Sequence, residues 1–228
     1  MVINRQAFPY GLIAGGMVDG NINVWDPYKM FNGDPDPLMS TISQHQGAIN
    51  GLQFNPHADS SHLLASGGAD AEVFVLSLDR PEQPTVFIPA PPPNNTKHTA
   101  DITQVSWNTQ VAHILASSST NGSTIVWDLR QKKAWCELRD PSGGPVSDIA
   151  WNPEQGLHLV RVEHKRRHVI ARVEPISDAG LALDRRAGGL KRRDVPVDRP
   201  DGNLRRLRQR RRGDGEPRVD PRVVLVER

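Results

Sequence analysis

The sequence predicts an all-β fold, a partial β-propeller of about three blades that do not close into a ring, followed by a disordered Arg-rich tail. A cassette recurs at an interval of 51 residues, as Leu12-Ile-Ala-Gly-Gly16, Leu63-Leu-Ala-Ser-Gly67 and Ile114-Leu-Ala-Ser-Ser118. A second landmark keeps the same interval, at Trp25-Asp26, Leu76-Ser77 and Trp127-Asp128. A fixed period indicates one structural unit that is copied, and this one slightly exceeds the roughly 40 to 45 residues of a four-stranded propeller blade.

The residues within each copy predict a β-hairpin. Between residues 115 and 128 the Asn121-Gly122 pair readily adopts the positive φ of a tight turn, and the residues that follow alternate between apolar and polar. The same hairpin is predicted with its turn at Asp19-Gly20 in the first copy and at Asp70 in the second. These hairpins are interpreted as the two middle strands of a blade.

Each later hairpin is preceded by a candidate inner strand. Residues 48–55, 102–108 and 146–152 alternate apolar and polar residues and end in an aromatic residue followed by Asn. Together the elements predict blades near 11–42, 45–88 and 98–139 and the start of a fourth at 145–160, the first without an inner strand. Because a closed propeller takes roughly four to eight blades, these elements do not complete a ring.

The cassettes and their Trp-Asp pairs resemble the WD repeat, and this resemblance implies a structural role for one set of polar residues. WD blades contain a buried His that is hydrogen-bonded through Ser or Thr and Trp to an acidic residue at the turn. On that pattern the expected structural positions are His98, Ser117, Trp127 and Asn121 in the third blade, His45, Ser66 and Asp70 in the second, and Asp19 and Trp25 in the first. Leu76 occupies the Trp position of the second blade and is expected to interrupt its relay.

The alternative is that these His and Asp residues are catalytic or bind a metal. Their recurrence once per blade favours structure, because a catalyst needs one site. The sequence also contains no Gly-rich phosphate loop, Cys-His cluster or nucleophile motif outside the repeats. We therefore predict that the protein is not an enzyme and has no catalytic residue, cofactor, metal site or small-molecule substrate.

Composition changes sharply near residue 160. Residues 1–160 contain 8 Lys and Arg against 15 Asp and Glu, and all the Trp, Phe and Tyr residues of the chain. Residues 161–228 contain 20 Lys and Arg against 11 acidic residues and no aromatic residue. The first part has the aromatic residues that a sheet core needs, and the second has little with which to offset its ordering entropy. The predicted domains are a partial propeller at 1–160 and a basic low-complexity tail at 161–228.

The tail, with its run Arg205-Arg-Leu-Arg-Gln-Arg-Arg-Arg212, is open to three interpretations. It is a disordered arm, a folded domain, or the product of out-of-frame or mis-spliced translation, because a bias toward Arg, Asp, Gly, Pro and Val is typical of GC-rich DNA read in another frame. A disordered arm of this charge would bind nucleic acid or an anionic surface. The lack of aromatic residues removes base stacking and argues against nucleic acid as the partner.

Three stretches of residues 8–160 narrow the resemblance further: Phe8-Pro-Tyr-Gly-Leu-Ile-Ala-Gly-Gly-Met-Val-Asp-Gly-Asn-Ile22, His45-Gln-Gly-Ala-Ile-Asn-Gly-Leu-Gln-Phe-Asn55 and Ser106-Trp-Asn-Thr-Gln-Val-Ala-His-Ile-Leu-Ala-Ser117. They resemble the N-terminal propeller of the large outer-coat subunits of COPII vesicle coats. The resemblance implies a scaffold that acts in vesicle budding and in protein transport from the endoplasmic reticulum to the Golgi. It also implies protein partners, namely the smaller propeller subunit of the cage, other cage propellers and the inner coat.

The same resemblance implies a cytoplasmic location, peripheral on endoplasmic reticulum exit sites and on COPII vesicle membranes. A single cysteine, Cys136, suits a reducing compartment, and no apolar run reaches the roughly 18 residues of a membrane span. Family members continue into further blades, a helical solenoid and a proline-rich segment, which this sequence does not contain. The alternatives are a generic WD-repeat protein-interaction adaptor and nucleic-acid binding through the Arg-rich tail.

Overall fold

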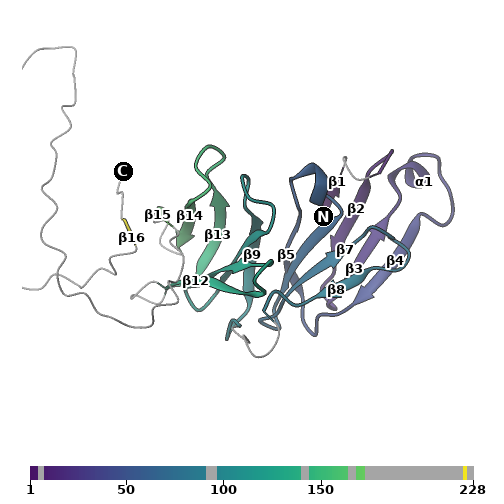
Figure 1. Ribbon diagram of the computed structural model, residues 1–228. Helices are drawn as coiled ribbons and strands as arrows, with labels where there is room; N and C mark the ends of the chain where they lie inside the picture. Colours follow the sequence, from purple (N-terminus) through teal and green to yellow (C-terminus); the bar gives the residue numbers. More distant parts are fainter. Residues whose placement is uncertain (5–7, 91–96, 140–143, 164–167, 173–222, 225–228) are drawn as a thin grey trace, which may run out of the picture. The chain divides into compact units, whose positions relative to one another are not determined.

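A computed structural model describes residues 1–4, 8–90, 97–139, 144–163, 168–172 and 223–224. All of these residues belong to one compact unit, residues 1–176 with 219–228. Within this unit the strands form four antiparallel sheets, each of four strands (Figure 1). The remaining residues of the predicted tail, 164–167, 173–222 and 225–228, lie outside the described residues.

Each sheet is an up-and-down arrangement of consecutive strands. The first contains β1 (Val2–Asn4), β2 (Leu12–Gly16), β3 (Asn21–Trp25) and β4 (Leu38–Ser43), with a short helix α1 (Pro27–Phe31) between β3 and β4. The second contains β5 (Ile49–Phe54), β6 (Leu63–Gly68), β7 (Val73–Ser77) and β8 (Thr85–Phe87), with a 3-10 turn η1 (Ala58–Ser60) after β5. The third contains β9 (Ile102–Trp107), β10 (Ile114–Ser119), β11 (Ser123–Asp128) and β12 (Lys133–Arg139). The fourth contains β13 (Val146–Trp151), β14 (His158–Glu163), β15 (His168–Arg172) and β16 (Val223–Val224).

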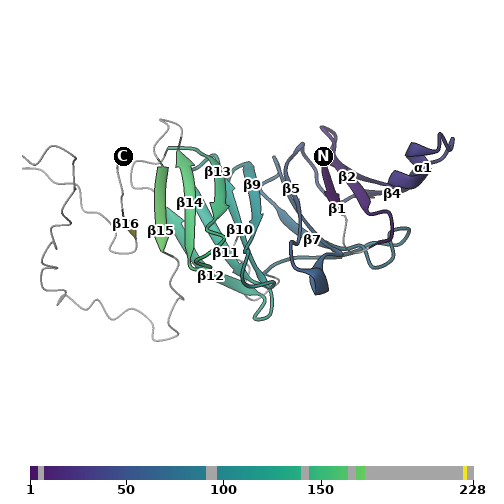
Figure 2. The same cartoon turned by 90° about the horizontal axis from the view of Figure 1, so that it is seen from above.

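The sheets are stacked in chain order through their first strands. Strand β1 contacts β5, β5 contacts β9, and β9 contacts β13, as the neighbouring labels of Figure 2 allow the reader to follow. Repeated four-stranded sheets joined along their first strands are the arrangement of a β-propeller, and the four sheets of this unit are unclosed. The structure therefore confirms the predicted all-β partial β-propeller, with four sheets where about three blades were predicted.

Three apolar layers lie between successive sheets. Residues from the first and second sheets, such as Ile22, Val24 and Leu64, form one layer. A second layer joins the second and third sheets, and a third joins the third and fourth. Because adjacent residues of a strand point to opposite faces, Leu64 and Ala65 belong to different layers, and the middle strands are buried on both faces.

The tight turn between the second and third strands of a blade has the same backbone conformation in three sheets. Gly20, Ala71 and Gly122, which are 51 residues apart, have φ of 88°, 64° and 83°. The residue before each, Asp19, Asp70 or Asn121, accepts a hydrogen bond from the backbone N–H two residues further on. A side chain that caps its own turn explains why this position is Asp or Asn in every copy.

The first sheet contains an inner strand that the sequence pattern did not predict. Strand β1 pairs with β2 in the register Val2 to Ala14 and Asn4 to Leu12. Asn4 lies 51 residues before Asn55 and corresponds to the Asn that follows each of the other inner strands, with Ile3 in place of the aromatic residue. Because the aromatic residue is missing, the sequence pattern did not reveal this strand.

The fourth sheet extends beyond the boundary predicted at residue 160. Strand β14 continues to Glu163 and pairs with β15 from His158 to Val162. The two-residue alternation of burial continues, because Leu159, Arg161 and Glu163 are all buried. Two charged residues are accommodated there since Arg161 and Glu163 form an ion pair of 2.8 Å with each other.

Candidate functional site

The polar relay of the third sheet is a continuous chain of hydrogen bonds. The Trp127 indole Nε1 donates to the Ser117 hydroxyl at 2.8 Å, and Ser117 Oγ lies 2.7 Å from His98 Nε2. On the other side of the ring His98 Nδ1 lies 2.9 Å from Ser123 Oγ, which donates to Asn121 Oδ1 at 2.7 Å. The structure thus brings together the four residues expected in this blade and adds Ser123.

The order of the relay differs from the expected one. On its Nδ1 side, His98 is connected to Asn121 through Ser123. On its Nε2 side, His98 is connected through Ser117 to Trp127, where the chain of hydrogen bonds ends. The physical reason is that an indole has one N–H donor and no acceptor, so Trp127 cannot pass a hydrogen bond onward to the turn. Ser123 was missed because the matching position of the second blade is Glu72, which gives no repeat signal.

The direction of these bonds fixes the state of His98. Ser117 accepts from Trp127, and its own proton remains available to donate to His98 Nε2. Ser123 donates to Asn121, which leaves its oxygen to accept from His98 Nδ1–H. The ring therefore carries a proton on Nδ1. Burial lowers the pKa of His98 from 6.5 to about 4, so near neutral pH the ring is neutral and Nε2 accepts from Ser117.

The second sheet contains a shorter relay. His45 Nε2 lies 2.9 Å from Ser66 Oγ, and His45 Nδ1 lies 3.0 Å from both carboxylate oxygens of Asp70. Leu76, fully buried, stands at the Trp position and offers no donor to Ser66. The space next to the His45 ring is filled by Phe74, which contacts it edge-on with the ring centres 4.8 Å apart.

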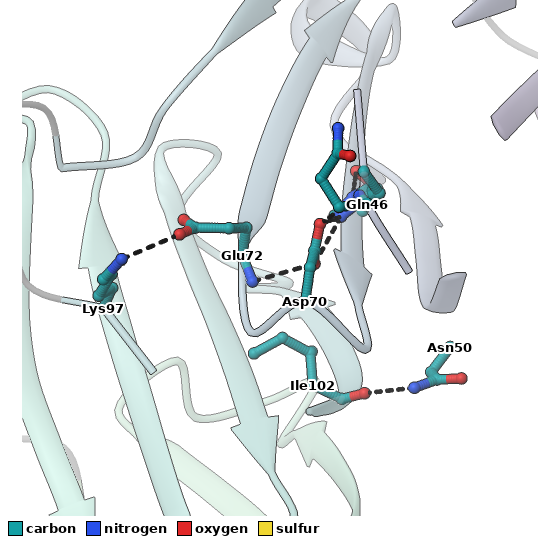
Figure 3. A network of polar contacts seen from close by, with 8 residues as sticks. Gln46, Asn50, Asp70, Glu72, Lys97 and Ile102 are labelled. Atoms are coloured by element: carbon teal, nitrogen blue, oxygen red, sulfur yellow. Dashed lines mark hydrogen bonds and ion pairs between the residues drawn. The ribbon is translucent and has the colours of Figure 1, made fainter. Parts of the chain in front are cut away.

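Asp70 is the most highly coordinated residue of the second relay. Its carboxylate accepts from His45. It also accepts from the backbone N–H groups of Gln46 and Glu72, as Figure 3 shows. Burial raises the pKa of Asp70, but the hydrogen bonds from Gln46, His45 and Glu72 outweigh it and lower the pKa below its ordinary value. The neighbouring Glu72 carboxylate pairs with Lys97 at 3.3 Å, which ties the second sheet to the segment that enters the third.

Among the described residues of the first sheet no relay is formed. Asp19 is exposed and caps its turn by accepting from the N–H of Asn21 at 3.0 Å. Gly15 stands at the position of Ser66 and Ser117, so there is no hydroxyl for Trp25 to donate to. The Trp25 ring covers this glycine, because a Cβ at Gly15 would lie 2.8 Å from the ring. The structure therefore does not bring Asp19 and Trp25 together.

This arrangement suits a structural role better than a chemical one. The His98 ring is 3% exposed and both its nitrogens are occupied by hydroxyls, so it has no access to a substrate. Within the described ranges there is no group of three or more His, Cys, Asp or Glu side chains that could hold a metal ion. We propose that the relays hold together the strands of their own sheets.

A second polar system joins each sheet to the next and was not predicted as such. The side-chain amide Nδ2 of Asn4 donates to the carbonyl of Ser61, that of Asn55 to Ala112 at 2.8 Å, and that of Asn108 to Gly156 at 2.6 Å. Asn4 is the last residue of β1, and Asn55 and Asn108 directly follow β5 and β9. Each acceptor precedes the second strand of the following sheet. We call these three bonds the Asn ladder. Its signal in the sequence was the Asn that follows the aromatic residue of each inner strand.

Further bonds cross the same boundaries at equivalent positions. Asn50 Nδ2 donates to the Ile102 carbonyl at 2.9 Å, which Figure 3 shows, and Thr103 Oγ1 donates to the Val146 carbonyl at 2.7 Å. In the reverse direction, the indole of Trp107 donates to the carbonyl of Gln53, and the indole of Trp151 to that of Ser106, both at 3.0 Å. The inner strands are thus joined by hydrogen bonds as well as by apolar contact.

The repeats match a known family model. The model described as WD domain, G-beta repeat matches residues 37–76 and 92–128. These ranges contain the second and third relays. Within the part of the chain that the structure describes, no helix is long and apolar enough to cross a membrane.

Curated relatives are similar over most of the chain. The sequence is 35% identical over 173 residues to a protein transport protein SEC31 of Dictyostelium discoideum, covering 72% of this chain and 12% of that protein. It is 37% identical over 159 residues to protein transport protein Sec31A of Danio rerio, covering 69% and 12%. It is 37% identical over 150 residues to protein transport protein sec31 of Aspergillus terreus, covering 66% and 11%. The chain therefore spans about an eighth of the length of these relatives or less.

Solved structures support the fold. A chain in the crystal structure of a mitotic checkpoint complex superposes with a TM-score of 0.58 and 18% identity, covering 76% of this chain and 49% of that one. At this identity the likeness concerns the fold alone. The WD repeats and the similarity to relatives from slime mould, fish and fungus together lead to one conclusion: this chain belongs to the Sec31 family of protein transport proteins, of which it carries a WD-repeat segment.

Proposed function

We propose that this chain is a non-enzymatic scaffold of the outer COPII coat, acting in vesicle budding and in protein transport from the endoplasmic reticulum to the Golgi. The observation that carries the proposal is the identity of 35–38% to Sec31 proteins over about two thirds of the chain. The buried relays support it, because their His and Ser side chains are closed to a substrate. The role is to present rigid sheets and their loops to other proteins.

The proposed partners are the smaller propeller subunit of the cage, other cage propellers and the inner coat. The proposed location is the cytoplasmic side of endoplasmic reticulum exit sites and of COPII vesicles. Since the chain spans only 11–12% of its relatives, it would supply contacts made by WD repeats and not the whole activity of those proteins.

Two other functions are distinguished from this one by a single experiment. A generic WD-repeat adaptor would bind peptides without associating with the coat, and an Arg-rich tail would bind nucleic acid with a steep dependence on salt. The fluorescently tagged chain is expressed in cells that carry a marked COPII subunit. We expect it to collect at exit sites, and a diffuse or nuclear distribution would contradict the proposal.

A tail variant makes the experiment specific. Replacing the six Arg residues of 205–212 by Gln removes the densest charge and leaves the described sheets untouched. If the sheets direct the chain to the coat, this variant still collects at exit sites. If the tail directs it, the variant loses its position.

A further inference from the structure

An apolar groove lies at the outer margin of the boundary between the second and third sheets. Its volume is about 500 Å³. One wall comes from Val86, Phe87 and Ile88, at the end of the second sheet, and the other from Leu129 and Lys132, in the turn that joins β11 to β12. No sequence motif pointed to this groove, and the relays and the Asn ladder do not extend into it.

The wall of the groove that the second sheet provides consists of apolar side chains that are exposed to solvent. Phe87 and Ile88 are consecutive residues, 50% and 52% exposed, and they lie among the large exposed apolar side chains of the described residues. Covering apolar area of this kind favours a complex, because the area is removed from water. The wall therefore favours an apolar side chain as its occupant.

The backbone next to the groove is a free sheet edge. Strand β8 has three residues, whereas the outer strands β4 and β12 have six and seven. It pairs on one side with Val75, Leu76 and Ser77 of β7, and among the described residues no strand pairs with its other side. Alternate residues of such an edge direct N–H and C=O groups outward, where an extended peptide can pair with them.

A positively charged side chain, Lys132, lies at the opposite rim of the groove. Lys132 is exposed, and its backbone has φ of 52° in the turn before β12. No ion pair to its ammonium group occurs in the described portion of the chain. A carboxylate on the occupant would complement this charge and fix the direction in which the occupant lies.

We propose that this groove binds an extended segment of a partner protein that carries apolar residues at alternate positions and an acidic residue at its end. The segment adds as a strand to the free edge of β8. Its apolar side chains contact Phe87 and Ile88, and its carboxylate pairs with Lys132. This binding site is independent of the proposed function in the coat and would exist in any WD-repeat adaptor with the same residues.

The test uses the whole chain and a defined probe. The probe is a fluorescein-labelled peptide of sequence Asp-Thr-Val-Thr-Leu-Thr-Val-Thr-Asp, whose acidic ends allow it to lie in either direction. Binding is followed by fluorescence anisotropy at low and high salt. We expect saturable binding that weakens as salt screens the contact with Lys132.

Variants and control peptides separate the parts of the proposal. Lys132→Glu and Ile88→Ser are each expected to weaken binding by about fivefold or more, because one reverses the rim charge and the other removes apolar contact. Lys29→Glu on α1 makes the same change of charge far along the chain and is expected to leave binding unchanged. A peptide with Pro in place of two central Thr residues is expected to bind weakly, because Pro cannot complete the strand pairing.

Several results would overturn the proposal. They are no saturable binding of the acidic probe, an equal effect of Lys132→Glu and Lys29→Glu, or equal binding of the Pro-containing peptide. Binding of decanoate that depends on Ile88 and Lys132, without binding of the peptide, would also overturn it in favour of an amphiphile site. Thermal unfolding of each variant confirms that a loss of binding is not a loss of fold.

Discussion

The side-chain amide of Asn108 donates to the backbone carbonyl of Gly156 at 2.6 Å, across the boundary between the third and fourth sheets. The same side chain accepts from the N–H groups of Gln110 and Val111, so it closes a turn within its own sheet while it holds the next one. It is 1% exposed. Asn108 thus makes hydrogen bonds both within its own sheet and to the next sheet. Substitutions at this position can separate the contributions of these two sets of bonds.

Asn108→Asp is expected to lower the free energy of unfolding by about 1–3 kcal/mol, because the carboxylate can still close the turn but cannot donate to Gly156. Asn108→Ala loses the turn bonds as well and is expected to cost more. Urea unfolding followed by tryptophan fluorescence measures both. An unchanged free energy of unfolding in Asn108→Asp would mean that the bond to Gly156 contributes nothing, and equal values for the two variants would mean that the turn bonds contribute nothing.

Ser117→Ala and Ser66→Ala form a matched pair of substitutions. Ser117 serves both Trp127 and His98, so its loss leaves two buried groups unsatisfied and is expected to cost about 2–4 kcal/mol. Ser66 serves only His45, and its loss is expected to cost about 1–2 kcal/mol. Thermal or urea unfolding of both variants tests the difference. A larger effect at Ser66 would contradict the assignment of the relay.

Stability is expected to fall in mild acid because of His98. The pKa of this residue is lowered to about 4 in the folded chain, so between that pH and 6.5 only the unfolded chain binds the proton. The stabilisation is complete above pH 6.5, decreases as the pH falls, and is lost near pH 4, a change of about 3 kcal/mol. Asp70 adds to the loss at lower pH, since its pKa is also lowered.

The measurement for His98 is unfolding by urea at a series of pH values, with His98→Gln as the reference. The neutral amide does not titrate, so the variant is expected to show a flatter dependence in this range. Parallel curves for the two proteins would show that His98 does not titrate as described.

Ala71→Gly is expected to raise the free energy of unfolding by about 0.5–1 kcal/mol, because a left-handed conformation strains any residue with a Cβ. The reverse change at the matching turn, Gly122→Ala, is expected to destabilise by a similar amount. Gly20→Ala is expected to cost more, since its Cβ would also meet the backbone carbonyl of His45. Differential scanning calorimetry ranks the three variants, and no gain at Ala71 would contradict the strain.

The sequence predicted the parts of the fold that repeat. The WD-repeat resemblance gave the expected members of the relays, of which His45 and His98 lie 53 residues apart. The 51-residue interval placed the middle strands of three sheets, because each copy packs similar residues in the same way. It could not reveal Ser123, which has no counterpart in the second sheet, or β1, where Ile3 replaces the aromatic residue. It also could not show that the Asn ladder crosses between sheets, because a periodic pattern gives the position of a side chain but not its partner.

The Asn ladder has a consequence for how the protein is made. In each of its bonds the donor belongs to the sheet nearer the N-terminus and the acceptor to the one after it. During synthesis the Asn donor leaves the ribosome before its acceptor. Each completed sheet therefore exposes an Asn side-chain amide whose acceptor carbonyl, in the next sheet, has not yet been synthesised. Because repeat proteins are stabilised by nearest-neighbour interfaces, every newly released sheet can attach to a finished surface in the order of synthesis.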